Sequence, residues 1–196
     1  MRVVLASASP ARLRTLRAAG IEPEVIVSHV EEAAFDIADP SDLAVTLARA
    51  KAQHVAAGLS PPNALVIGCD SVLDLDGEAL GKPVDAADAA ARWRRMRGRS
   101  GVLVTGHCVV DTASGRQVGA AARTTVHFAS VSDAEIDAYV ASGEPLQVAG
   151  AFTIDGLGGA FVTGLEGDHH NVVGLSLPLL RDLCARLDIA WPRLWR

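Results

Sequence analysis

The stretch Ala64-Leu-Val-Ile-Gly-Cys-Asp-Ser71 decides the fold that we expect for this chain of 196 residues. It is a continuous apolar run of strand length that ends on an acid, which is typical of a strand buried on both faces of a sheet. Asp70 therefore stands where a buried strand opens into a site. A carboxylate at such a point binds a divalent cation or orients a water molecule, although it can also simply cap a turn.

The segments before this strand predict a second strand and two helices. Met1–Ala6 is expected to be a strand that passes into a helix capped by Ser9, with Pro10 at the first helical position. The apolar spacing from Asp36 to Gly58 predicts a long amphipathic helix with Ser41 as its N-cap.

The second half of the chain has a different texture. Val102–Val110 and Gln117–Phe128 are expected to pair as an antiparallel hairpin, and Ser176–Leu187 to form a closing helix. Val148–Ile154 and Ala160–Thr163 are expected to be extended. The sequence therefore predicts a mixed α/β fold, in which a twisted sheet that is not purely parallel is flanked by helices.

Length, composition and charge exclude several classes of protein. With 196 residues and a hydrophobic share of 49%, residues 1–196 are expected to form one domain, or two lobes that share one core. The formal charge of −5 argues against a nucleic-acid partner. No apolar run reaches the ~18 to 20 residues that cross a bilayer, and no secretion signal is visible, so we expect a cytoplasmic protein without a membrane partner.

The three cysteines are expected to be reduced, buried thiols. Cys69, Cys108 and Cys184 are odd in number, far apart and in no CxxC spacing. That pattern supports neither a disulfide framework nor a zinc knuckle.

The first loop and the Gly81-Lys-Pro83 turn carry the residues suited to phosphate. Ser7, Ser9 and Arg12 lie where a strand passes into a helix N-terminus, a place that favours anions. Lys82 can neutralise phosphate charge. The spacing in the first loop, taken alone, somewhat favours a capped helix with a solvent-facing arginine over an anion site.

Glu31-Glu32 and Lys51 can be interpreted in two ways. The paired glutamates can supply a ligand for Mg²⁺ or remain solvated on the surface, and Lys51 on its helix has the same ambiguity.

An ordered set of motifs decides between these interpretations. In chain order they are Ser7-Ala-Ser-Pro-Ala-Arg12, Glu31-Glu32, Leu47-Ala-Arg-Ala-Lys-Ala52, Gly68-Cys-Asp-Ser71, Gly81-Lys-Pro83, Gly143-Glu-Pro145, Ala149-Gly150 with Asp155-Gly-Leu-Gly158, and Asn171-Val-Val-Gly-Leu175. From residue 3 to residue 181 the chain resembles the Maf family of nucleotide pyrophosphatases.

The resemblance implies an activity, a fold and a set of site residues. The activity is hydrolysis of a nucleoside triphosphate at the α-phosphorus to a monophosphate and pyrophosphate, dependent on Mg²⁺ or Mn²⁺. The fold is shared with inosine triphosphate pyrophosphatases, with two lobes around a central cleft, and relatives commonly form homodimers. By position, the catalytic acid is Asp70, the metal-binding acids are Glu32 and Asp70, and the phosphate-binding residues are Ser7, Ser9, Arg12, Lys51 and Lys82.

Three positions that bear on base specificity depart from the known subgroups. Relatives resembling the dTTP and UTP hydrolases carry Arg, Thr and Gln where this chain has Ala11, Ser71 and Asp155. Relatives resembling the 7-methyl-GTP hydrolases carry Trp, Gln and Glu there. Because a carboxylate at Asp155 can accept from both N1–H and the exocyclic amine of guanine, the sequence favours a purine or a modified base over strict pyrimidine selectivity.

A second class of function stays open at this point. A nucleotide-binding regulator of division or septum formation with little turnover would carry the same motifs. His169-His170 is expected to replace loop residues rather than to bind zinc, and His107 to be structural rather than a general base.

Overall fold

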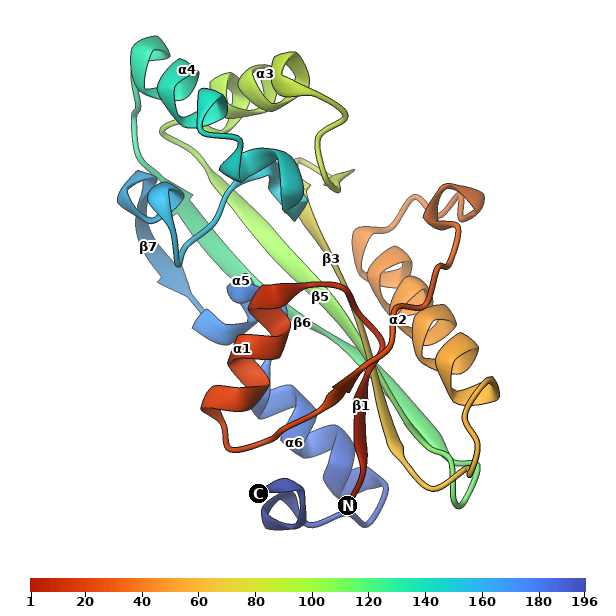
Figure 1. Ribbon diagram of the computed structural model, residues 1–196. Coiled ribbons are helices and arrows are strands. Elements are labelled where there is room, and N and C mark those ends of the chain that lie inside the picture. The colour runs from red at the N-terminus through yellow and green to blue at the C-terminus, as the bar shows by residue number, and fades with distance from the viewer.

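A computed structural model describes all residues, 1–196, and shows a mixed α/β architecture (Figure 1). Its seven-stranded sheet has the order β2-β1-β3-β5-β6-β7, and β4 pairs with the outer part of β3. The strands are β1 (Val3–Leu5), β2 (Glu24–Val25), β3 (Leu65–Leu75), β4 (Glu78–Leu80), β5 (Ser100–Asp111), β6 (Gln117–Phe128) and β7 (Val162–Glu166). The helices are α1 (Pro10–Ala18), α2 (Pro40–Ala57), α3 (Ala86–Met96), α4 (Asp133–Ala141), α5 (His169–Val173) and α6 (Leu177–Arg186).

The strands pair in both directions, as the sequence predicts. β1 runs parallel to β2 and β3, whereas β3, β5, β6 and β7 form an antiparallel series. The predicted hairpin of β5 and β6 is confirmed. β3 runs to Leu75, further than the decisive stretch suggested, because β5 pairs with it as far as Asp74.

One edge of β3 is open in its middle. β1 pairs with Leu65–Ile67 and β4 pairs with Leu73–Leu75, so on this edge residues 68–72 pair with neither strand. Asp70 lies inside this interval. The gap brings the loop after β1, the turn after β4 and the centre of β3 to the same region.

Alternation along β3 divides its side chains between two layers of helices. Leu65, Ile67 and Cys69 belong to a core cluster with residues of α1 and α6. Val66 belongs to a second cluster with Ala48 and other residues of α2. Figure 1 shows α2 on one side of the long strands and α1 and α6 on the other. All three cysteines are free and buried, as predicted.

Helix α2 lies unusually close to the sheet because two glycines face it. A Cβ added at Gly68 would overlap the carbonyl oxygen of Ala48, and one added at Gly106 would overlap that of Ala44. Only glycine permits this approach. The α2 backbone is thereby held against β3 and β5.

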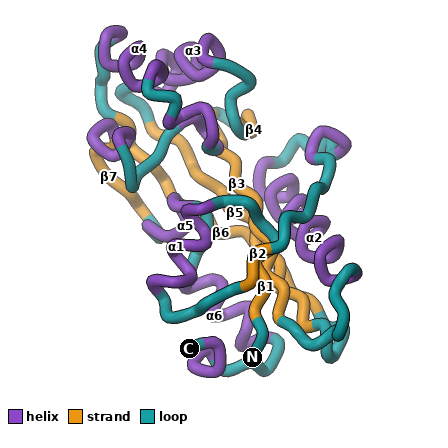
Figure 2. The backbone as a smooth tube through the Cα atoms, in the orientation of Figure 1, coloured by secondary structure: helices purple, strands orange, loops and turns teal.

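Helices α3 and α4 lie at the far end of the sheet (Figure 2). This end has its own apolar core. Trp93 is fully buried there and makes edge-to-face contacts with Phe128, Tyr139 and Phe161. Its Nε1 donates to the carbonyl oxygen of Ala151. The sheet runs without interruption between the two ends.

Two expectations about local structure are wrong. α2 begins at Pro40, and its cap is Asp39, whose side chain accepts from the backbone N–H groups of Ser41 and Asp42. Proline occupies the first helical position here, so the cap is the residue before it, as with Ser9 and Pro10 in α1.

Val148–Ile154 and Ala160–Thr163 are not continuously extended. Gly150 and Ala151 have positive φ angles of 70° and 57°, which turn the chain into the 3₁₀ segment η3 (Ala149–Ala151). A further 3₁₀ segment, η4 (Leu157–Phe161), precedes β7.

None of the helices has both the length and the hydrophobicity to cross a membrane.

Candidate active site

Asp70 is a nearly buried carboxylate in the middle of the sheet. Its relative exposure is 7%, and its Oδ1 accepts a hydrogen bond from Lys51 Nζ at 2.5 Å. Oδ2 accepts no hydrogen bond from the protein, and it is not fully shielded from solvent. One oxygen is therefore fixed by the protein while the other can contact a ligand or water.

Lys51 joins Asp70 to a second acid. Its ammonium nitrogen also lies 2.6 Å from Oε1 of Glu32, in the 3₁₀ segment η1 (Glu32–Ala34). The Lys51 side chain is 11% exposed and that of Glu32 is 57% exposed. Lys51 reaches Asp70 because α2 lies so close to β3. The sequence-predicted residues Glu32, Lys51 and Asp70 are thus brought into direct contact.

The protonation of Asp70 reflects opposing effects. Burial raises the pKa of this carboxyl above its usual range, while the positive charges of Lys51 and Arg12 lower it in part. The net direction is upward. A carboxyl with a raised pKa takes up a proton from water more readily than an ordinary aspartate.

Arg12 is almost wholly committed to the protein. Its Nε donates to Gly174 O at 2.7 Å, Nη1 donates to Ser7 Oγ and Cys69 O, and Nη2 donates to Ser71 Oγ. A guanidinium has five N–H donors, so one donor of Nη2 remains for a ligand. Arg12 therefore ties α1, β3 and the end of α5 together and adds buried positive charge beside Asp70.

The predicted serines belong to the same network. Ser7 Oγ accepts from Arg12 and from the N–H of Ser9, and Ser9 caps α1 as predicted. Ser71 Oγ shares a hydrogen bond with Thr105 Oγ1 at 2.9 Å in addition to its contact with Arg12. The structure places Ser71 beside Arg12 rather than beside Asp155.

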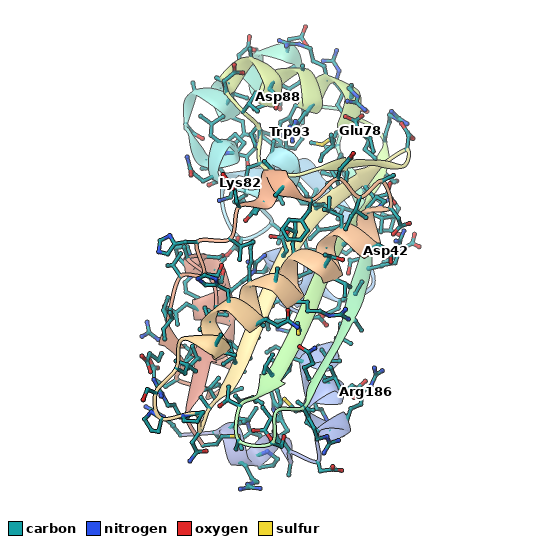
Figure 3. All side chains as sticks on the ribbon, turned by 90° about the vertical axis from the view of Figure 1, so that its right-hand side faces the viewer. Asp42, Glu78, Lys82, Asp88, Trp93 and Arg186 are labelled. Atoms are coloured by element: carbon teal, nitrogen blue, oxygen red, sulfur yellow. The ribbon has the colours of Figure 1, made fainter.

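Lys82 is exposed and makes no hydrogen bond or ion pair with the protein. It lies just after β4, which borders the open edge of β3. Figure 3 shows Lys82 at the base of the end of the molecule that carries Trp93 and Asp88. No contact joins it to the cluster of Asp70, Lys51 and Glu32.

Ala11 and Asp155 lie outside the charged cluster. Ala11 is half-buried on α1. Asp155 comes from the loop between η3 and η4 and pairs with Arg14 of α1, with 3.1 Å between Nη2 and Oδ2. Arg14 was not anticipated from the sequence, and its position one helical turn after Ala11 was the signal that could have found it.

Two further polar residues support the site from behind. Thr105 is fully buried and donates to the carbonyl oxygen of Asn171, while Asn171 donates to Leu103 O and Thr124 Oγ1. Thr105 lies within a strand pattern and gave no signal of this role, whereas Asn171 is the first residue of the Asn171-Val-Val-Gly-Leu175 motif.

His107 is structural, as predicted. It is fully buried, with Nδ1 bonded to Thr105 O and Nε2 accepting from the Ser176 N–H. His169 and His170 begin the short helix α5 instead of lying in a loop, because Asp168 caps that helix through the His170 N–H.

Comparison with known proteins identifies the family of this chain. The family model described as Maf-like protein matches residues 2–187. The chain belongs to the Maf family. A relative from Streptomyces coelicolor named nucleoside triphosphate pyrophosphatase is 62% identical over 194 residues, or 99% of this chain and 94% of the relative. A relative of the same name from Salinispora tropica is 62% identical over 200 residues, covering 100% of this chain and 88% of its own.

A solved structure, that of the Staphylococcus aureus Ham1 protein, is also similar to the chain. It is 14% identical in sequence with a TM-score of 0.42, covering 66% of this chain and 73% of the other.

The resemblance to the Maf family implies a divalent cation. The side chains present could supply only part of the coordination shell of such an ion. No group of three or more His, Cys, Asp or Glu side chains is arranged to hold a metal ion. Asp70 and Glu32, however, present two neighbouring carboxylates, with Oδ2 of Asp70 free. Mg²⁺ is commonly held by one or two carboxylates together with substrate phosphates, and this donor set matches that mode.

Proposed function

We propose that this Maf-family protein is a nucleoside triphosphate pyrophosphatase that hydrolyses the bond between the α and β phosphates. The products are a nucleoside monophosphate and pyrophosphate. The observation that carries the proposal is the Glu32–Lys51–Asp70 cluster at the open edge of β3, beside buried Arg12. Relatives at 62% identity carry the corresponding name.

Asp70 is the group that handles the attacking water. Lys51 holds Oδ1, which fixes the orientation of the carboxylate, and Oδ2 is left to accept a proton from water. The raised pKa of Asp70 favours that uptake. The water-derived oxygen ends on the α-phosphorus, and the leaving group is pyrophosphate.

Charge on the phosphates is met by the protein's cations. Lys51 has three N–H donors and uses two on carboxylates, so one remains for a phosphate oxygen. The free donor of Arg12 and the unpaired ammonium of Lys82 add to it. Such fixed donors stabilise charge that develops on the leaving pyrophosphate.

We also assign a divalent cation, Mg²⁺ or Mn²⁺, to this site on the basis of its charges. Asp70 and Glu32 together cancel the charges of Lys51 and Arg12, which leaves Lys82 as the net positive charge against a triphosphate. Glu32 and Asp70 would hold the ion with the phosphates, and the ion would neutralise phosphate charge when bound.

The site assignment includes Ser7 and Ser9, whose hydroxyl groups border the N-terminus of α1. We assign them to phosphate binding, because amide and hydroxyl donors at a helix N-terminus favour anions. We also expect the protein to act in the cytoplasm and to form a homodimer. Measuring its mass in solution by light scattering checks the homodimer.

The activity is tested with purified protein, Mg²⁺ and a panel of nucleotides in water enriched with ¹⁸O. We expect monophosphate and pyrophosphate, with the ¹⁸O label in the monophosphate. Diphosphate and orthophosphate would contradict the assigned bond. Tight nucleotide binding without turnover would instead support the regulatory alternative.

Asp70→Asn tests the assigned role, with Asp74→Asn as its matched control. Asp74 lies four residues further along the same strand and pairs with Arg123 instead of Lys51. Asp70→Asn is expected to lower kcat by about 10² to 10⁴-fold and to retain nucleotide binding, because an amide cannot accept the proton. Asp74→Asn is expected to keep its turnover. Equal turnover in both variants would refute the role of Asp70.

A further inference from the structure

A cavity of about 300 Å³ lies between α1 and α5. Arg14 and Thr15 line one wall, His169 and His170 line the other, and Asp155 lies at the rim. Figure 1 shows α1 and α5 side by side. The volume of the cavity is at the lower end of the range for small-molecule sites in proteins.

The cavity shares a wall with the phosphate-facing residues. Val173, which lines it, immediately precedes Gly174, whose carbonyl oxygen accepts from Arg12 Nε. Thr15 lies one turn after Arg12 on the same helix. The cavity therefore adjoins the segments that hold Arg12, namely α1 and the end of α5.

Arg14 and Asp155 form an ion pair that stability alone does not explain. Their side chains are 65% and 35% exposed, and pairs so exposed contribute little to folding. Asp155 Oδ1 accepts no hydrogen bond from the protein, and Arg14 uses only one N–H. Both partners thus keep free hydrogen-bonding groups at the rim of the cavity.

The loop that carries Asp155 is fixed on both sides. The carboxylate of Glu144 accepts from Thr153 Oγ1 and from the backbone N–H groups of Leu157 and Gly158. Asp155 lies between these anchors. A charged group held in place before its ligand arrives loses little entropy on binding.

The paired groups match one base edge. Guanine presents an acceptor at O6 next to donors at N1 and the 2-amino group, and these complement a guanidinium donor beside a carboxylate. Uracil and thymine place a second acceptor where the carboxylate would need a donor. Adenine and cytosine present an acceptor in place of the N1–H donor.

The geometry points to Arg14 as a specificity-determining residue that, with Asp155, selects guanine nucleotides in this cavity. The inference rests on the proposed pyrophosphatase function and names its substrate class. Arg14 donates to O6, and Asp155 accepts from N1–H and the 2-amino group. One imidazole of the pair His169 and His170, whose ring planes are 87° apart, supplies a ring face for the purine. The guanidinium lies one turn further along α1 than the position of Ala11, where pyrimidine-type relatives carry arginine.

The test compares kcat/KM for GTP, ITP, ATP and dTTP. ITP differs from GTP only by lacking the 2-amino group, so it isolates the contact with Asp155. We expect the wild type to prefer GTP over ITP by about tenfold or more, since charge-assisted hydrogen bonds are the stronger ones. Asp155→Asn is expected to abolish that preference.

Variants of Arg14 separate recognition from structure. Arg14→Ala is expected to lower kcat/KM for GTP and ITP about tenfold and to spare dTTP, while Arg14→Lys restores part of the loss. Arg17→Ala is the matched control, because Arg17 lies on the same helix, pairs with Glu22 and lines no part of the cavity. It is expected to behave as the wild type.

The outcomes distinguish this inference from the proposed function. Turnover of several nucleotides with equal kcat/KM for GTP and ITP would overturn the inference and leave the pyrophosphatase function standing. The same holds if Arg14→Ala reduces all four substrates equally, or changes none. Absence of turnover with every nucleotide would refute the proposed function itself.

Discussion

Asp70 owes its chemistry to being a charged side chain in a strand that is otherwise apolar. Transfer of a carboxylate out of water is costly, and the cost is met here by one ammonium and one guanidinium. Lys51 serves both Asp70 and the more exposed Glu32. Removing Asp70, Lys51 or Glu32 alone leaves an unbalanced charge in or beside the sheet.

The pH dependence of turnover follows from this balance. Burial raises the pKa of Asp70, so we expect the acidic limb of kcat/KM to have its midpoint above 3.8, the ordinary value for aspartate. Lys51→Met removes the larger of the two opposing charges and is expected to move the limb to still higher pH. Profiles of kcat/KM from about pH 3 to pH 8 measure both midpoints. A wild-type midpoint at or below 3.8 would contradict the prediction.

At the scale of elements, the site depends on how closely two of them approach β3. Gly68 and Gly106 allow α2 to contact the sheet, and this brings Lys51 to Asp70. On the open edge, the turn after β4 carries Lys82. The Gly81 carbonyl oxygen in that turn accepts from Arg92 Nη1 at 2.7 Å and from the Gly150 N–H at 3.0 Å.

Gly106→Ala is expected to displace α2. The added methyl group would overlap the Ala44 carbonyl, so we expect a loss of about 1–3 kcal/mol in the free energy of unfolding, with lower kcat because Lys51 moves with the helix. Urea denaturation and steady-state kinetics measure the two effects. Gly58→Ala, at the end of the same helix, meets only an ordinary contact of 3.7 Å with Val55 O and serves as the control. Equal behaviour of the two variants would exclude the close approach as the cause.

Arg92→Met is expected to affect substrate binding through Lys82. Arg92 pairs with Asp88, which also accepts from the Val84 N–H, so together they fix both sides of the Lys82 turn. Loss of this support should raise KM for the nucleotide several-fold with a smaller change in kcat. The control is Arg94→Met. Arg94 also lies on α3, but its exposed side chain pairs with Asp137 of α4. An unchanged KM in Arg92→Met would show that the turn is positioned without it.

At the scale of the whole molecule, the two ends of the sheet have separate apolar clusters, and polar links connect the layers between them. His107 is one such link, since it receives the Ser176 N–H at the start of α6 while it lies on β5. Asn171 is another, from α5 to β5 and β6. Global stability is therefore expected to respond to the charge state of His107.

Acid should destabilise the protein partly through His107. Burial lowers the pKa of this imidazole from 6.5 to about 4, so the unfolded chain binds more protons than the folded one between these values. The stabilisation is complete above pH 6.5 and is lost as the pH falls towards 4, up to about 3 kcal/mol at 1.36 kcal/mol per pKa unit. Urea unfolding at several pH values measures the slope. His107→Gln should flatten it in this window, and an unchanged slope would contradict the assignment.

Much of the fold could be predicted from the sequence because it depends on local sequence patterns. The apolar run that ends at Asp70, the Ser9-Pro10 helix start and the hairpin of β5 and β6 each depend on neighbours along the chain. The segments from 148 to 163 were mispredicted because positive φ angles at Gly150 and Ala151 interrupt an apolar pattern that resembles a strand. The cap of α2 is Asp39 rather than Ser41, two residues earlier than predicted, because Pro40 occupies the first helical position.

By itself the sequence determined the fold class, the family resemblance and the chemical types of the candidate site residues, since these follow from periodicity, composition and ordered motifs. Only the tertiary structure decided which charges meet. It joined Lys51 to both Glu32 and Asp70, committed four of the five N–H donors of Arg12 to two carbonyls and two serine hydroxyls, and paired Asp155 with Arg14 across 141 residues. Ion pairs between distant segments depend on how closely helices pack on the sheet, and no local pattern encodes that distance.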